Sequence, residues 1–145
     1  MRTQTEPTSF VVAEYGADGL AWAKRYAVGT PSVVSLVQAS DEASHEFAVR
    51  VRETARAFVR GGGRIARAVL VGAGATGATV LASRSLAIRA LVAPMVDEGE
   101  GTMVLHAAGT DRFSMRALAD TVAGQVSGTG VRVAASIDVD VADVA

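Results

Sequence analysis

The fold is decided by residues 64–92, whose sequence is R-I-A-R-A-V-L-V-G-A-G-A-T-G-A-T-V-L-A-S-R-S-L-A-I-R-A-L-V. An apolar run over Ala66–Val71 is followed by a glycine-rich turn over Gly72–Gly77 and then by a long helix-forming segment. This pattern predicts a buried strand, a tight turn and a helix over 76–93 that ends or bends at Pro94. The helix is apolar nearly all round, so it is either deeply packed or part of a contact between copies of the chain.

The glycine turn matches the pattern G-x-G-x-x-G through Gly72, Gly74 and Gly77. Glycines at such a turn let the backbone approach a phosphate, whose charge is met by unpaired amides and by the helix dipole. The sequence therefore predicts a nucleotide or phosphate site, although it does not identify the cofactor. Its predicted residues are Gly72, Gly74, Thr76 and Gly77, with Ser40 and Asp41 at the same edge of the sheet.

Close packing of strand and helix is the alternative explanation of these glycines. The turn lies at mid-chain, whereas a dinucleotide fold carries it in its first strand-helix unit. The acidic residue expected about 20 positions later would be Asp97, which follows a proline and is predicted to lie in a turn.

Upstream of this stretch, the sequence predicts a strand over Ser9–Tyr15 and a strand over Ser32–Val37 that is buried on both faces. A helix is expected from about Glu42 to Arg60, with cap residues in Gln38–Glu42 and a glycine stop at Gly61–Gly63. Residues 20–27 fit either a short helix or a hairpin strand.

Downstream, a fourth strand is predicted over Thr102–His106 and an amphipathic helix over Ser114–Val126. Hydrophobic and polar residues then alternate strictly over Val131–Val141, so one face of this strand is expected to be buried and the other exposed to solvent. Such a strand lies at a sheet edge or in a solvated antiparallel pairing.

Together these elements predict a single α/β domain over residues 1–145, a three-layer sandwich of the Rossmann-like or flavodoxin-like kind. Its sheet is expected to have about five mostly parallel strands, with the last strand at an edge. The strand order stays open. Ligands of such folds bind at the carboxyl ends of the strands, near a switch in strand order. We expect burial in neighbouring central strands for Val33, Val34, Leu36, Val69, Leu70 and Val71.

Two residues are candidates for catalysis, His106 at the end of the fourth strand and Asp111 shortly after it. A base and an orienting carboxylate at this edge would make the protein a small enzyme. Asp111 and Ser114 also suit the N-terminal cap of the next helix. Two histidines and no cysteine predict no metal site.

Charge is distributed unevenly along a chain whose net charge is −1. Residues 50–89 carry eight arginines and one glutamate, and Arg52, Arg56 and Arg60 share one helix face. A solvated face explains these arginines better than nucleic-acid binding does, because the overall balance is acidic. The polar N-terminus and the lack of long apolar runs predict a cytoplasmic protein without membrane contact.

The leading function hypothesis is a non-catalytic ligand-binding or regulatory module that works as a homo-oligomer, most simply a homodimer. The apolar segment Val80–Val92 and the strand Val131–Val141 are the predicted contacts between copies. The ligand would be a small anionic molecule at the glycine turn, and the competing hypothesis is the small enzyme that uses His106 and Asp111.

Overall fold

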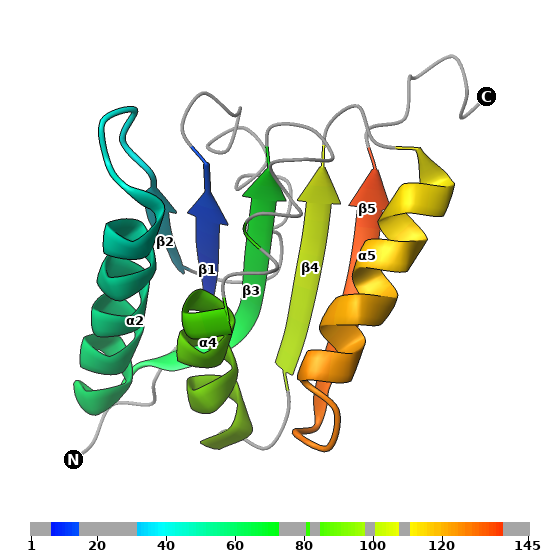
Figure 1. The fold of residues 1–145 in the computed structure, drawn as a ribbon. Helices are drawn as coiled ribbons and strands as arrows, with labels where there is room; N and C mark the ends of the chain where they lie inside the picture. Colours follow the sequence, from blue (N-terminus) through cyan, green and yellow to red (C-terminus); the bar gives the residue numbers. More distant parts are fainter. Residues whose placement is uncertain are drawn as a thin grey trace.

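Five parallel strands form one sheet in the order β2-β1-β3-β4-β5 (Figure 1). In this computed structural model the described residues are 7–14, 32–72, 81, 85–97, 101–107 and 111–137. The strands are β1 (Pro7–Ala13), β2 (Ser32–Val37), β3 (Arg64–Gly72), β4 (Gly101–Ala107) and β5 (Val131–Ile137). The described helices are α2 (Ser44–Arg60), α4 (Ser85–Asp97) and α5 (Arg112–Gln125). The predicted α/β fold class is confirmed, and so is the place of the last strand at an edge.

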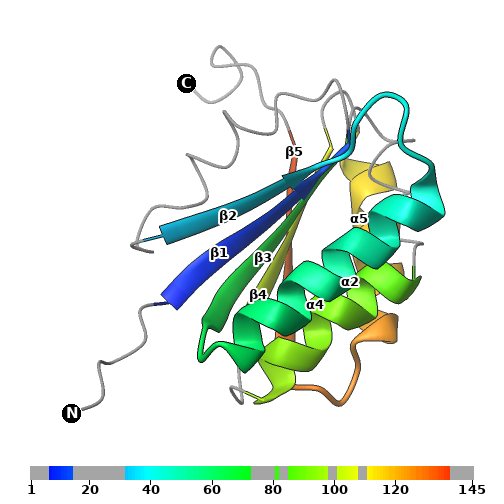
Figure 2. The same ribbon diagram turned by 90° about the vertical axis from the view of Figure 1, so that its left-hand side faces the viewer.

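The three described helices all cover the same face of the sheet (Figure 2). Each of them joins two parallel strands: α2 joins β2 to β3, α4 joins β3 to β4, and α5 joins β4 to β5. Along these connections the chain moves across the sheet in one direction. Right-handed crossovers place such helices on one face. The connection from β1 to β2 runs in the opposite direction, and its predicted helix or strand over 20–27 lies outside the described residues. Of the three predicted layers, the described residues thus form the sheet and one helical layer.

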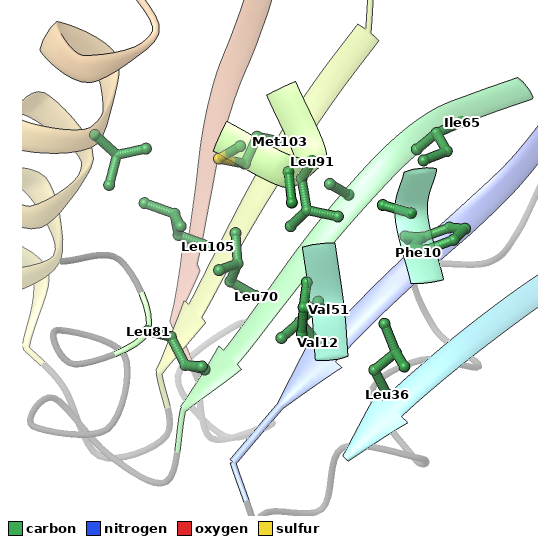
Figure 3. Close-up of a cluster of buried hydrophobic side chains, with 14 of the residues drawn as sticks. Phe10, Val12, Leu36, Val51, Ile65, Leu70, Leu81, Leu91, Met103 and Leu105 are labelled. Carbon is green, nitrogen blue, oxygen red and sulfur yellow. The ribbon is translucent and has the colours of Figure 1, made fainter. Parts of the chain in front are cut away.

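The main core lies between the sheet and these helices (Figure 3). In it, Phe10 of β1 and Leu70 of β3 share a cluster with Val51 of α2 and Leu91 of α4, and all four are fully buried or nearly so. A smaller buried cluster on the opposite face comprises Val11, Ala13, Val69, Val71 and Val104. Because alternate side chains of β1, β3 and β4 enter both clusters, these strands carry the nearly continuous apolar sequence of a sheet buried on both faces.

The prediction that Ser32–Val37 is a central strand is wrong, although the bounds of the strand are right. β2 lies at the edge and pairs with β1. Its Leu36 is buried, but Val33 and Val37 expose 39% and 41% of their surface. A short apolar run does not distinguish an edge from the centre of a sheet, because strand order is set by the crossovers and not by the strand itself. The predicted burial of Val69–Val71 in a central strand is confirmed.

Helix α2 begins at Ser44, two residues after the predicted start at Glu42. Its N-cap residue is Ala43, which makes no side-chain cap bond, and Glu42 is engaged with Arg50 instead. The glycine stop is confirmed: Gly62 has a φ of 91°, a left-handed conformation that glycine adopts without steric strain.

Helix α4 continues through Pro94 to Asp97, so of the two predicted alternatives, an end or a bend at the proline, the end is wrong. Pro94 lies in the last turn, where its missing N–H removes one helical hydrogen bond and leaves the earlier turns intact. Met95 directly after it is fully buried in the main core and holds this turn against the sheet. Asp97, predicted in a turn, is therefore the last residue of the helix.

Packing within one copy of the chain explains why the helix segment before and after Pro94 is so apolar. Leu81, Leu91 and Met95 are fully buried, and α4 packs beside α2 on the sheet. Among the predicted alternatives, deep packing thus holds for the side chains that the structure describes in this segment.

Strand β5 is parallel to β4, so the alternative of an antiparallel pairing is wrong. Val131 and Val133 pack against the main core, while Arg132 and Ala134 are exposed, in agreement with the predicted buried and exposed faces. Ala135, predicted on the buried face, is exposed. Residues 138–141 of the predicted strand lie outside the described residues.

Replacement of Gly63 by alanine is expected to destabilise the fold. A Cβ at this position would lie 2.3 Å from the ring of Phe58, and that ring is held edge-on against Phe10 with 5.2 Å between centroids. Overpacking of this kind costs about 1–3 kcal/mol. Urea unfolding of Gly63→Ala measures the loss. Gly124→Ala is the matched control, because a Cβ there meets nothing within 4 Å, and its stability should equal or exceed that of the wild type.

Candidate functional site

The carboxyl ends of β1 and β3 form the point where the strand order reverses. These two strands are neighbours, with Ala13 in register with Val71, and the N–H of Glu14 donates a hydrogen bond of 3.2 Å to the carbonyl oxygen of Val71. From β1 the chain continues to β2 on one side, and from β3 it continues to β4 on the other. Connections that leave in opposite directions open a crevice above the strand ends, and ligands of open α/β sheets bind in this crevice.

The glycine-rich sequence begins at this switch point. Gly72 is the last residue of β3, it is buried, and it is in register with Ala107 of β4. Gly74, Thr76 and Gly77 lie outside the described residues. The turn is therefore at mid-chain in the sequence but follows the strand at the switch point of the sheet.

The other predicted binding residues, Ser40 and Asp41, occupy the tip of a turn after β2. The N–H of Glu42 donates to the carbonyl oxygen of Ala39 at 3.0 Å and closes this turn, whose two tip residues are exposed. The N–H of Gln38 donates to the carbonyl oxygen of Ala13 at 3.0 Å, which places the loop beside the end of β1. Two strand spacings, about 10 Å, separate the ends of β2 and β3, a span that a phosphate and its attached ribose can cover.

Arg50 of α2 fixes the shape of this loop. Its Nε and Nη2 donate to the two carboxylate oxygens of Glu42 at 3.0 and 2.9 Å, and Nη2 also donates to the carbonyl oxygen of Val37 at 2.7 Å. The guanidinium lies 5.2 Å from the ring centroid of Phe47. A bidentate pair of this geometry is more specific than a single surface ion pair, so the loop that carries Ser40 and Asp41 is held in one conformation.

Gln38 supports the loop from inside. Its side chain is buried, and its Nε2 donates to the carbonyl oxygen of Glu42 at 2.9 Å. Sequence reasoning missed both Gln38 and Arg50, because their partners are set by the path of the loop, and a pair eight residues apart across a helix start has no periodic signal.

The same contacts lower the pKa of Glu42, first through the side-chain hydrogen bond from Arg50 and then through the backbone N–H of Ala39. A carboxyl whose pKa is lower in the folded than in the unfolded state stabilises the fold above its unfolded pKa. That contribution is lost as the pH falls through the folded pKa, which lies below the ordinary value of 4.5.

Glu42→Gln is therefore expected to lower the melting temperature at pH 7 by a few degrees at most, because the pair is at the surface. The difference between variant and wild type should shrink as the pH is lowered through the range below 4.5. Melting curves across that pH range measure it. A difference that is the same at every pH would show that the charge of Glu42 does not hold the loop.

His106 lies inside the sheet. It is the sixth residue of β4, its exposed fraction is 0%, and it is in register with Val71 of the smaller buried cluster. Since Leu105 and Ala107 belong to the main core, His106 points to the face away from the described helices.

Asp111 is the N-cap residue of α5. Its Oδ1 accepts a hydrogen bond of 2.7 Å from the backbone N–H of Ser114, and this contact is the main cause of the lowered pKa of the carboxyl. The cap interpretation of Asp111 is thereby confirmed. His106 and Asp111 thus occupy different environments, one within the sheet and one at an exposed helix start.

Substitution at Asp111 separates the hydrogen bond of the cap from the charge of the carboxylate. Asp111→Ala is expected to lower the melting temperature, because the first turn of α5 loses its side-chain acceptor, whereas Asp111→Asn should keep most of the stability. Thermal unfolding at pH 7 compares the two variants. Equal losses in both would assign the effect to the charge of the carboxylate and not to the cap.

One exposed aromatic ring also lies at this edge of the sheet. Phe113 in the first turn of α5 exposes 85% of its surface, and no periodic pattern in the sequence marked it as exposed. Within the described ranges, no three histidine, aspartate or glutamate side chains gather as metal ligands would. No helix in the described part of the chain is long and apolar enough to cross a membrane.

Comparison with known proteins agrees with this architecture. No protein-family model and no curated protein matches the sequence. Among solved structures, the chain is similar to a short-chain dehydrogenase from Streptomyces avermitilis, with a TM-score of 0.52 and 15% sequence identity. The match covers 99% of this chain and 75% of the dehydrogenase. At this level of identity it shows the fold, a Rossmann-like parallel α/β sheet.

Proposed function

We propose that this protein is a non-catalytic binding module for a nucleotide or a related phosphate-bearing ligand, held in the crevice between the carboxyl ends of β1 and β3. One observation carries the proposal: the G-x-G-x-x-G sequence begins at Gly72, the last residue of the strand at the switch point. Sequence pattern and strand order are independent of each other, and both point to the same place.

The surroundings of Gly72 support a phosphate at this place. The neighbouring strand ends at Ala13, so the backbone of β1 borders the crevice on the side opposite β4. The turn of Ser40 and Asp41, fixed by Arg50, provides hydroxyl and carboxylate oxygens two strands away. Such oxygens are acceptors for the hydroxyl groups of a ribose, as the acidic residue of dinucleotide folds is.

The fold of the similar dehydrogenase is consistent with this ligand class. A small enzyme that uses His106 and Asp111 has less support, because the carboxylate of Asp111 caps α5 and His106 is buried in β4. The proposal accordingly assigns the crevice to binding.

Thermal shift against ATP, ADP, NAD⁺ and NADP⁺ tests the proposal. A ligand at 100 times its dissociation constant adds about 2.7 kcal/mol of stability, or roughly 8–10 °C for a domain of this size. Gly74→Val should abolish that shift, because a branched side chain fills the space that the phosphate needs. Gly124→Ala, in the open space at the end of α5, should keep it.

Two outcomes would contradict the proposal. If none of the four nucleotides shifts the wild-type protein, the crevice does not bind this ligand class. If Gly74→Val keeps the wild-type shift, the ligand binds elsewhere and the glycines serve packing alone.

A further inference from the structure

The outer edge of β2 carries main-chain groups that point away from the sheet. The N–H of Gln38 donates to the carbonyl oxygen of Ala13 in β1. In a strand, the N–H and C=O of one residue point to the same side, and those of the next residue point to the opposite side. Leu36 and Val34 therefore bond toward β1, as Gln38 does. The groups of Val33, Ser35 and Val37 point outward, where the described residues place no further strand.

One of these outward groups is already used. The carbonyl oxygen of Val37 accepts a hydrogen bond of 2.7 Å from Nη2 of Arg50. The N–H and C=O groups of Val33 and Ser35 are left as a short hydrogen-bonding edge at the middle of the strand.

This edge lacks the usual protection. Natural proteins guard exposed edges with charged residues or proline, but β2 consists of S-V-V-S-L-V and has neither. The opposite edge strand β5 does carry an exposed charge, Arg132. In addition, Val33 and Val37 expose 39% and 41% of their surface on one face of β2.

We propose that a second copy of this chain pairs with this edge, β2 against β2 in antiparallel orientation, to form a homodimer with one continuous sheet. A two-fold axis through Val34 places Val33 of one copy opposite Ser35 of the other. Each such pair exchanges both of its N–H···O bonds, and Val34 faces its own counterpart as a non-hydrogen-bonded pair.

Arg50 determines this register. A pairing centred on Ser35 would require the carbonyl oxygen of Val37, which Arg50 occupies. The register centred on Val34 uses the groups of Val33 and Ser35, for which the described residues provide no partner, and leaves the contact of Arg50 undisturbed.

The charges of α2 suit the antiparallel arrangement. α2 lies against β2 and Arg50 reaches the edge of that strand, so the two-fold axis brings the α2 helices of both copies side by side in opposite directions. Near the start of α2, the exposed Asp41 and Glu46 are acidic, and the exposed cation of Arg50 is already paired with Glu42. The exposed charges of its last two turns are basic, at Arg56 and Arg60. The acidic end of one α2 helix thus meets the basic end of the other, and the two helix dipoles are antiparallel, which is the favourable arrangement.

The proposed interface differs from the two contacts that the sequence predicted. The described side chains of the segment Val80–Val92 are mostly buried within one copy, and β5 carries Arg132 at its edge. The edge of β2 remains as the unprotected apolar strand among the described elements.

Light scattering at micromolar concentration tests the proposal first. The wild type is expected at about twice 14.8 kDa. Ser35→Pro should be a folded monomer, because proline removes an N–H that points away from β1 and so breaks no bond within one copy. Ser35→Ala is the matched control: it keeps the N–H and should remain a dimer.

Oxidative cross-linking tests the register and does not depend on the folding of the proline variant. The chain has no cysteine, so Val34→Cys carries a single thiol. Opposite residues of a non-hydrogen-bonded pair have Cα atoms about 4.5 Å apart, within the range that a disulfide spans. Val34→Cys should therefore form a covalent dimer, whereas Ala134→Cys on the exposed edge of β5 should not.

Each contrary result overturns the proposal. A wild-type monomer of 14.8 kDa excludes the dimer. A dimer that persists in folded Ser35→Pro, or that cross-links through Ala134→Cys but not through Val34→Cys, places the interface elsewhere. None of these results depends on nucleotide binding, so the two proposals stand or fall separately.

Discussion

The handedness of the crossovers is the constraint on which the rest of this structure depends. Strands twist to the right, so a helix between two parallel strands packs back onto the sheet with one hand only. After the first crossover places β2 on one side of β1, each described helix moves the chain in the other direction and lies on the same face. This single reversal puts β3 at the centre, leaves β2 at the edge and makes the ends of β1 and β3 the point where the strand order switches. The burial of β3 on both faces, the place of the glycine turn and the exposed edge strand are three consequences of one topological choice.

Local patterns predicted the elements well, because periodicity and turn residues act over a few positions. The apolar run before Gly72 is a central strand, Gly62 ends α2, and Asp111 caps α5. Strand order is a property of the whole chain, and the same patterns could not supply it. For this reason Val33 was expected inside the sheet and is found at its edge. For the same reason, the mid-chain position of the glycine turn counted against a phosphate site, although the strand before the turn lies where the strand order switches.

The remaining differences come from tertiary contacts that outweigh local preferences. Glu42 was expected in the first turn of a helix, where the dipole favours an acid, but it accepts two bonds from Arg50 and the helix begins after it. Pro94 was expected to end or bend α4, but the helix continues through it, and Met95 directly after it is buried in the main core. The Glu42–Arg50 pair depends on the path of the loop and the burial of Met95 on tertiary packing, so neither follows from a periodic pattern in the sequence.

Arg50 links two places in the fold: the carboxyl edge of the sheet, where we propose the ligand, and the outer edge of β2, where we propose the second copy. Through Glu42 it fixes the turn that carries Ser40 and Asp41 at the carboxyl edge of the sheet, and through Val37 it occupies one outward carbonyl of β2. Its guanidinium reaches both because α2 starts at Ser44, soon after the end of β2 at Val37. A cation at this point stabilises the loop beside the proposed ligand crevice and, with the same atom, limits which main-chain groups of β2 can bond to another strand. One side chain thus contacts both the turn at the carboxyl edge of the sheet and the outer edge of β2.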